Sequence, residues 1–171
     1  RIPAVMLASP APGVWRAGDA HVNLYVVADG ADLTTTTPGF GVALYNTNYF
    51  TDNITGVGTG AGLVIHSAGA ITLYNINANF NAGVGADLNA STSGYAVTLL
   101  GSNYFTENQD TGLFVNGAGA VTVYNVTARW NLGNGVEINN RDSLANLGVT
   151  LLGTNVFNDN AIGLKVLSHG I

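Results

Sequence analysis

The feature that most constrains this chain is a repeat of 23 to 29 residues. One pattern reads VALYNTNYFTDN from Val42, VTLLGSNYFTEN from Val97 and VTLLGTNVFNDN from Val149. A second pattern, ITLYNINANFN from Ile71 and VTVYNVTARWN from Val121, alternates with the first. A repeat of this length indicates a solenoid in which each repeat forms one coil against its neighbours.

One asparagine occupies the same position in every repeat once the two patterns are aligned. These residues, spaced 28, 27, 23 and 29 apart, are Asn53, Asn81, Asn108, Asn131 and Asn160. Stacked side-chain amides can donate to one neighbouring coil and accept from the other, which allows a polar turn to be buried without orphaned groups. The sequence therefore predicts an internal Asn ladder.

A glycine follows each ladder asparagine and opens a short segment with apolar outer members. The segments are LVI (63–65), ADL (86–88), LFV (113–115), VEI (136–138) and LKV (164–166). The middle residue varies freely, so each segment has the inward, outward, inward alternation of a strand.

The fold class follows from the repeat and from a composition that disfavours helices, with 9% charged residues and 23 glycines. We predict an all-β fold, a single-stranded right-handed parallel β-helix of about five to six coils. Residues 41–171 form the coils, whereas residues 1–40 form a leader and the first coil or cap. Because the chain begins with Arg1, we expect a processed form or an excised piece.

The two coil patterns, with G-L/V-x-V/I after each, resemble the right-handed β-helix repeats of bacterial surface and secreted proteins. This group is the pectin-lyase-like superfamily in its broad sense, and the resemblance runs from about Val42 to Val166. The resemblance implies a β-helix fold but does not identify one function, since lyases, hydrolases, tailspikes, adhesins and passive stalks share such folds.

Charge and composition exclude several classes of partner and cofactor. The net charge is −5 and the five basic residues are scattered, which disfavours nucleic acid. No cysteine is present, and no apolar run reaches the roughly 18–20 residues that span a bilayer, so we expect no membrane insertion. His21, His66 and His169 fall in unrelated registers, and we predict no metal site, no cofactor and no catalytic residue.

The strongest enzymatic alternative is an outward column that contains Asp87, Phe114 and Glu137. Its two carboxylates lie two coils apart, about 9–10 Å, near the upper end for an inverting glycosidase pair. We expect Lys165 to pair with Glu137 from the next strand, and we favour solvated surface charges over a polysaccharide-active site.

Three further columns recur from coil to coil. An acidic column, for which we expect an Asx-type turn role, contains Asp52, Glu107 and Asp159. An outward hydroxyl column, for which ice binding is a minor alternative, contains Thr72, Thr98, Thr122 and Thr150. A third column, which we expect in the core at a bend with an exposed ridge as the alternative, contains Tyr45, Tyr74, Leu100, Tyr124 and Leu152.

The ends of a β-helix expose unpaired strands, and the segment from Leu164 has no evident cap. We therefore expect a secreted or cell-surface structural protein that stacks head to tail on copies of itself. The residues predicted for this edge are Ile2, Val5, Leu7, Val22, Leu24, Val26, Leu164 and Val166. The alternative is an adhesin or stalk fragment that binds carbohydrate or another cell-surface ligand. Separately, the sequon at Asn89, which we expect in an exposed loop, is a candidate glycosylation site.

Overall fold

The computed structural model describes residues 14–17, 21–22, 29–54, 60–90, 94–141 and 147–169, the first two ranges by their backbone alone. Regular structure in these ranges consists of β-strands. No helix that could cross a membrane occurs among the described residues.

The strands form three parallel sheets with six strands each. Sheet A contains β1 (Val14–Ala17), β4 (Gly41–Leu44), β7 (Ile71–Tyr74), β10 (Val97–Leu100), β13 (Val121–Tyr124) and β16 (Val149–Leu152). Sheet B contains β2 (His21–Val22), β5 (Asn48–Phe50), β8 (Ile76–Asn77), β11 (Asn103–Thr106), β14 (Val126–Arg129) and β17 (Val156–Asn158). Sheet C contains β3 (Ala31–Thr35), β6 (Leu63–Ser67), β9 (Ala86–Ala90), β12 (Leu113–Gly117), β15 (Val136–Asn140) and β18 (Leu164–Ser168).

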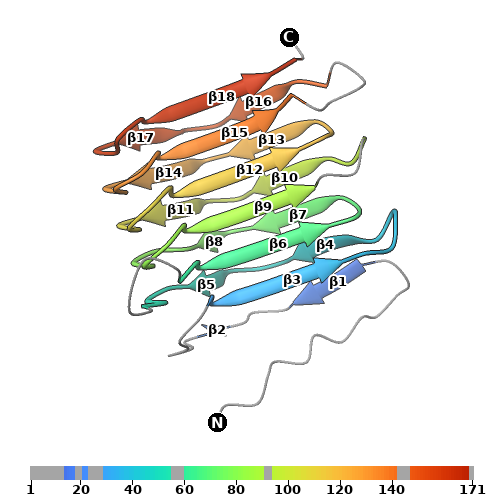
Figure 1. Cartoon of the computed structure of the whole chain (residues 1–171), viewed down its shortest axis with the longest axis horizontal. Coiled ribbons are helices and arrows are strands. Elements are labelled where there is room, and N and C mark those ends of the chain that lie inside the picture. Colours follow the sequence, from blue (N-terminus) through green and yellow to red (C-terminus); the bar gives the residue numbers. More distant parts are fainter. Residues whose placement is uncertain are drawn as a thin grey trace.

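The chain visits the three sheets in turn, and each strand pairs in parallel with the strand three places later. Figure 1 shows the strands stacked along one axis from β1 to β18. The predicted all-β parallel solenoid is therefore confirmed. The right-handed sense of the winding and the number of complete turns stay predictions.

The core lies between the three sheets, and strands β5 to β15 fill it with every second residue. On sheet B the inward positions alternate in size along the axis. These residues are Phe50, Ala78, Phe105, Ala128 and Phe157. Alternating large and small side chains allow successive layers to interdigitate, which gives the two repeat patterns of the sequence a packing reason.

The predicted Asn ladder is confirmed. The amide Nδ2 of Asn81 donates to Oδ1 of Asn108 at 2.8 Å, and Nδ2 of Asn108 donates to Oδ1 of Asn131 at 2.9 Å. Each of these Oδ1 atoms also accepts the backbone N–H of the preceding ladder residue. The Asn108 side chain has a further bond to the carbonyl of Ala78, so all of its buried polar atoms are paired.

The glycine that follows each ladder residue is required by close packing between coils. A Cβ added at Gly112 would lie 2.7 Å from Nδ2 of Asn131 and 2.7 Å from the carbonyl oxygen of Gly135. Only a residue without a side chain lets adjacent coils approach at the spacing of a parallel sheet.

A second set of asparagines, beyond the predicted ladder, holds the turns into sheet B in alternate coils. These residues are Asn48, Asn103 and Asn155. Asn103 is buried, accepts the backbone N–H of Ile76 and donates to the carbonyl of Tyr124. The recurring N-x-F of the first repeat pattern was the signal for it.

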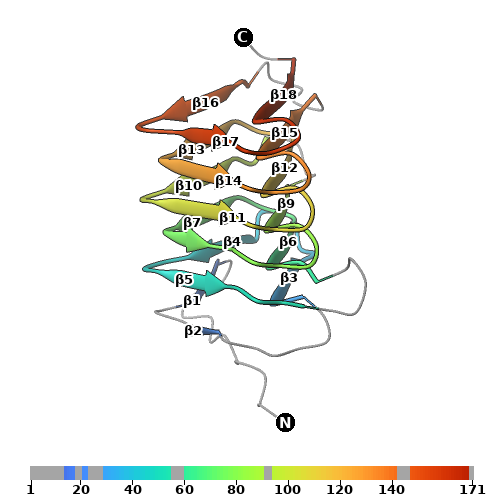
Figure 2. The same ribbon diagram turned by 90° about the vertical axis from the view of Figure 1, so that its left-hand side faces the viewer.

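Two stacked bends contain residues with a left-handed backbone. We call them the A–B bend, between sheets A and B, and the B–C bend, between sheets B and C; Figure 2 shows them on opposite sides of sheet B. The left-handed residues of the A–B bend are Asn46, Asn75, Gly101, Asn125 and Gly153. Those of the B–C bend are Asp52, Phe80, Glu107, Trp130 and Asp159.

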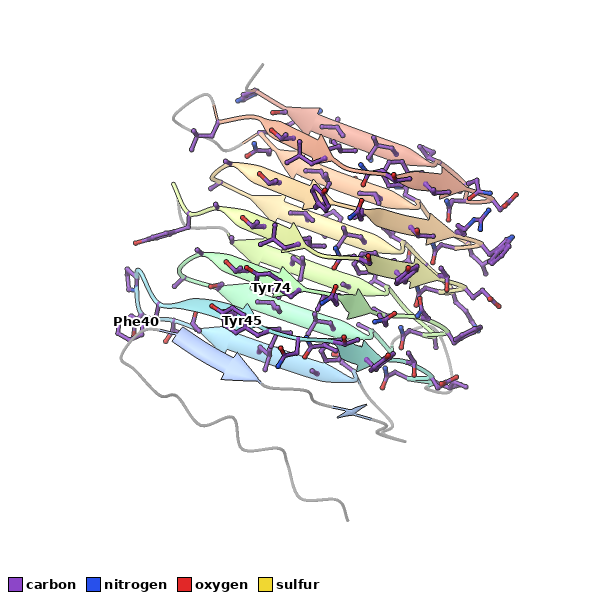
Figure 3. All side chains as sticks on the ribbon, turned by 180° about the vertical axis from the view of Figure 1, so that it is seen from behind. Phe40, Tyr45 and Tyr74 are labelled. Carbon is purple, nitrogen blue, oxygen red and sulfur yellow. The ribbon has the colours of Figure 1, made fainter. Side chains whose placement is uncertain are left out.

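The expectation that the Tyr/Leu column belongs to the core is wrong. Along β7, Leu73 is buried and Tyr74 lies on the outer face with Thr72, because successive side chains of a strand alternate between faces. Tyr124 is 37% exposed and Leu152 is 45% exposed. Figure 3 shows Tyr45 and Tyr74 one above the other on this face, and their stacked rings lie 5.4 Å apart.

Candidate functional site

The edge formed by β16, β17 and β18 is the first candidate site. Leu164 and Val166 occupy inward positions, beside Val136 and Ile138 of the neighbouring strand. They are nevertheless 36% and 39% exposed, whereas Val136 and Ile138 are fully buried. Within the described residues each strand of this edge has a neighbouring strand on one side only.

The Asn ladder is incomplete at the same edge. Asn160 accepts the backbone N–H and the Nδ2 of Asn131 with its Oδ1. Its own Nδ2 bonds to the carbonyl oxygens of Ala128 and Asn158, whereas in each preceding rung the Nδ2 reaches the next Asn of the ladder. One further coil would complete this rung.

The opposite edge of sheet C is β3, which carries the same inward and outward alternation. Asp32 and Thr34 are exposed on the outer side, and Leu33 packs partly buried against the core. The register through sheet C places Asp32 in the same column as Lys165, and Thr35 in the same column as Ser168.

The predicted ion pair between Lys165 and Glu137 is confirmed, with a distance of 2.7 Å between Nζ and Oε1. Glu137 also accepts a hydrogen bond from Asn134. Lys165 lies on the outermost strand of the sheet and 40% of its side chain is exposed, so its outer side can meet a second carboxylate.

The predicted edge residues of the leader lie largely outside the described residues. Ile2, Val5, Leu7, Leu24 and Val26 fall in this group. The backbone of Val22 is described, and it pairs with Phe50 in sheet B.

The outward column of sheet C has the predicted order, with Phe114 between Asp87 and Glu137. Asp87 lies between Val64 and Phe114 on neighbouring strands. Burial raises the pKa of its carboxyl, and the nearby His66 offsets part of that rise. A raised carboxyl pKa is a property of general acids. A glycosidase also needs a second carboxylate, and that of Glu137 already bonds to Lys165 and Asn134.

The acidic column lies in a turn as predicted, but no Asx-type bond from a backbone N–H to these carboxylates occurs among the described residues. Asp159 accepts a hydrogen bond from Asn158, but the carboxylates of Asp52 and Glu107 have no partner among the described residues. Their recurrence instead marks the left-handed position of the B–C bend, where the φ angles of Asp52 and Glu107 are 60° and 56°. At such a position the side chain points away from the body, and both residues are exposed.

The remaining predicted positions are separate from one another. Asn89 lies in strand β9, not in a loop, because the strand runs two residues beyond the apolar triplet. Its Oδ1 atom is buried and unpaired among the described groups. His66 is exposed on β6 and His169 is exposed after β18. The structure places no group of three or more His, Asp or Glu side chains together in its described ranges.

The hydroxyl column faces outward as predicted, with Thr72, Thr98 and Thr122 in register and half-buried, and Thr150 exposed. It lies beside the Tyr/Leu column on the outer face of sheet A, so this face combines hydroxyl and apolar rows.

Comparison with protein-family models, with curated proteins and with solved structures gives no match to this chain. Membership of the pectin-lyase-like superfamily therefore stays a prediction.

Proposed function

We propose that this protein is an extracellular structural subunit whose solenoid stacks head to tail, so that the β18 edge of one copy pairs with the β3 edge of the next. The observation that carries the proposal is the match of register and charge between these two strands. A contact of this kind is heterologous and does not close, and it therefore generates a filament.

The two edge strands have equal length and compatible patterns. In the stacked arrangement Leu164 and Val166 would lie beside Ala31 and Leu33, which extends the core across the junction. The same alignment puts Ser168 beside Thr35. Within the chain Thr35 already contacts the hydroxyl of Ser67, its neighbour in the same column, at 3.3 Å.

Charge favours the same alignment. Lys165 of one copy would lie beside Asp32 of the next, about 5 Å away across a parallel pair. The lysine would then be flanked by Glu137 on its own chain and by Asp32 on its neighbour. An opposite-charge pair across adjacent strands stabilises the pairing, whereas a like-charge pair opposes it.

The experiment compares the single variants Asp32→Lys and Lys165→Glu, alone and mixed in equal amounts. Each variant alone places like charges at every junction, so we expect sedimentation velocity to show a marked loss of assembly. In the mixture every junction between unlike variants again joins opposite charges, so we expect alternating copolymers and restored fibres by negative-stain electron microscopy. Asn116→Lys, at an outward position of the interior strand β12, is the control for added charge.

Two results would contradict the proposal. One is a monodisperse wild-type monomer at high protein concentration. The other is wild-type assembly that both single variants retain, which would mean that the contact uses another surface.

A further inference from the structure

The B–C bend carries a row of side chains that neither the core nor the proposed stacking requires. We call this row the B–C stripe. It consists of Asp52, Phe80, Glu107, Trp130 and Asp159, one residue from each of five successive coils. Acidic and aromatic residues alternate along it. The backbone N–H of Asp52 donates to the carbonyl of Asn79, and that of Phe80 donates to the carbonyl of Thr106, so the bends stack in register (Figure 2).

The two aromatic rings of the stripe are exposed, 47% for Phe80 and 52% for Trp130. The core does not need them, because the inward position of the same coils holds Ala78 and Ala128, both fully buried. Large aromatic side chains are unusual in the left-handed region, and their φ angles of 57° and 55° lie there. Exposed aromatic side chains in an unfavourable backbone conformation indicate a contact surface.

The Trp130 ring is held in place by its neighbour. The guanidinium of Arg129 lies 5.1 Å from the ring centroid, and Nε of Arg129 donates to Oδ1 of Asn158 at 2.6 Å. A cation over one face of the ring restricts its rotation and leaves the other face for a ligand. The ring is thus oriented before any ligand arrives, which lowers the entropic cost of binding.

The acidic members lie between and beside the rings. The carboxylates of Asp52 and Glu107 have no partner among the described residues, so they are free to accept hydrogen bonds from a ligand. Three carboxylates in one row also repel anions, which excludes polyphosphates and acidic polysaccharides as ligands.

The spacing identifies the shape of the ligand. Phe80 and Trp130 lie two strand spacings apart, about 10 Å, and Glu107 lies midway between them. In an extended β-1,4-linked glycan each sugar advances the chain by close to one strand spacing, and alternate sugars present the same face. Such a chain laid along the stripe would stack alternate sugar rings on Phe80 and Trp130 and direct hydroxyls to the carboxylates.

We infer that the B–C stripe binds a neutral, extended β-1,4-linked polysaccharide. The stripe lies within a single chain, so binding does not depend on head-to-tail stacking. In a stacked filament the stripes of successive copies would follow one another along the same side.

The test is cosedimentation of the full chain with microcrystalline cellulose and with chitin, together with affinity electrophoresis in gels that contain hydroxyethylcellulose. The informative variant is Phe80→Asn with Trp130→Asn, because asparagine tolerates the left-handed backbone and the protein should stay folded. We expect each substitution to raise the dissociation constant by about tenfold or more, as for buried aromatic anchors of other interfaces. The control is Tyr104→Ala, which removes an aromatic residue that is 43% exposed on sheet B but lies off the stripe, and it should bind like the wild type.

The inference is overturned if the wild-type protein binds none of these glycans, or if the double Asn variant binds as tightly as the wild type. Binding that disappears at moderate salt would also overturn it, because stacking on a neutral glycan should depend little on ionic strength.

Discussion

The A–B and B–C bends meet the same backbone requirement with different residues. Both place one residue per coil in the left-handed region. The A–B bend uses only asparagine and glycine there, the residue types that adopt this conformation most readily. The B–C bend uses aspartate, glutamate, phenylalanine and tryptophan, and it contains neither asparagine nor glycine at that position.

The hydrogen bonds around the bends explain why the B–C bend is stable with residues that disfavour the left-handed region. In the A–B bend the side chain of a left-handed asparagine bonds to the backbone of the next coil; Oδ1 of Asn125 accepts the backbone N–H of Thr154 at 2.8 Å, and Oδ1 of Asn75 accepts that of Ser102 at 3.0 Å. In the B–C bend that task belongs to the following residue, the ladder asparagine. The ladder therefore fixes the bend whatever side chain precedes the ladder asparagine. That preceding position is the one that we assign to ligand binding.

The largest expected effect comes from removing one rung of the ladder. Asn108→Ala would remove the side-chain partner of the buried backbone N–H of Asn81 and of the Ala78 carbonyl. It would also cost Nδ2 of Asn81 and Oδ1 of Asn131 one of their two bonds each. Each orphaned group costs about 1–3 kcal/mol, so we expect the free energy of unfolding to fall by at least about 3 kcal/mol in urea denaturation.

The matched control is Asn116→Ala, at an outward, half-exposed position of β12 in the same coil. We expect it to change stability by no more than about 0.5 kcal/mol. Equal effects of the two substitutions would mean that the ladder does not hold the B–C bend.

Much of this arrangement could be predicted from the sequence, because the ladder and the strand alternation repeat at fixed positions. The ladder residues Asn53 to Asn160 and the Lys165–Glu137 pair were predicted correctly. For the Tyr/Leu column, apolar character predicts the wrong side, because the alternation along the strand directs Tyr74 outward while Leu73 fills the core. The sequence does not predict that Phe80 and Trp130 belong to the B–C stripe. A left-handed position is recognised in a sequence by glycine or asparagine, and these two residues are neither.

A smaller effect is expected in the A–B bend itself. Gly101 has a φ angle of 76°, and a Cβ added there would overlap Oδ1 of Asn75. That oxygen accepts the backbone N–H of Ser102 at 3.0 Å, so it cannot move without losing a bond. We expect Gly101→Ala to lower the free energy of unfolding by about 1–2 kcal/mol, as measured by urea denaturation.

The exposed neighbour Ser102 supplies the comparison for that substitution. Ser102→Ala leaves the backbone bond to Asn75 in place and should be close to neutral. If Gly101→Ala were equally neutral, the A–B bend would tolerate ordinary residues as the B–C bend does, and the contrast between the two bends would fail.

The smallest effect is a gain in stability at the B–C bend. Glu107 has a φ angle of 56° and its carboxylate has no partner among the described residues, so Glu107→Asn should relieve backbone strain without loss of a contact. We expect the free energy of unfolding to rise by up to about 1 kcal/mol. Glu107→Gln removes the same charge but keeps a side chain that disfavours the left-handed region, and thermal unfolding of both variants separates the two contributions. A gain for Asn alone would show that the residue at this position is strained and is kept there for a purpose other than stability. Equal gains for Asn and Gln would show that the effect comes from charge, and backbone strain would then no longer support a binding role for the B–C stripe.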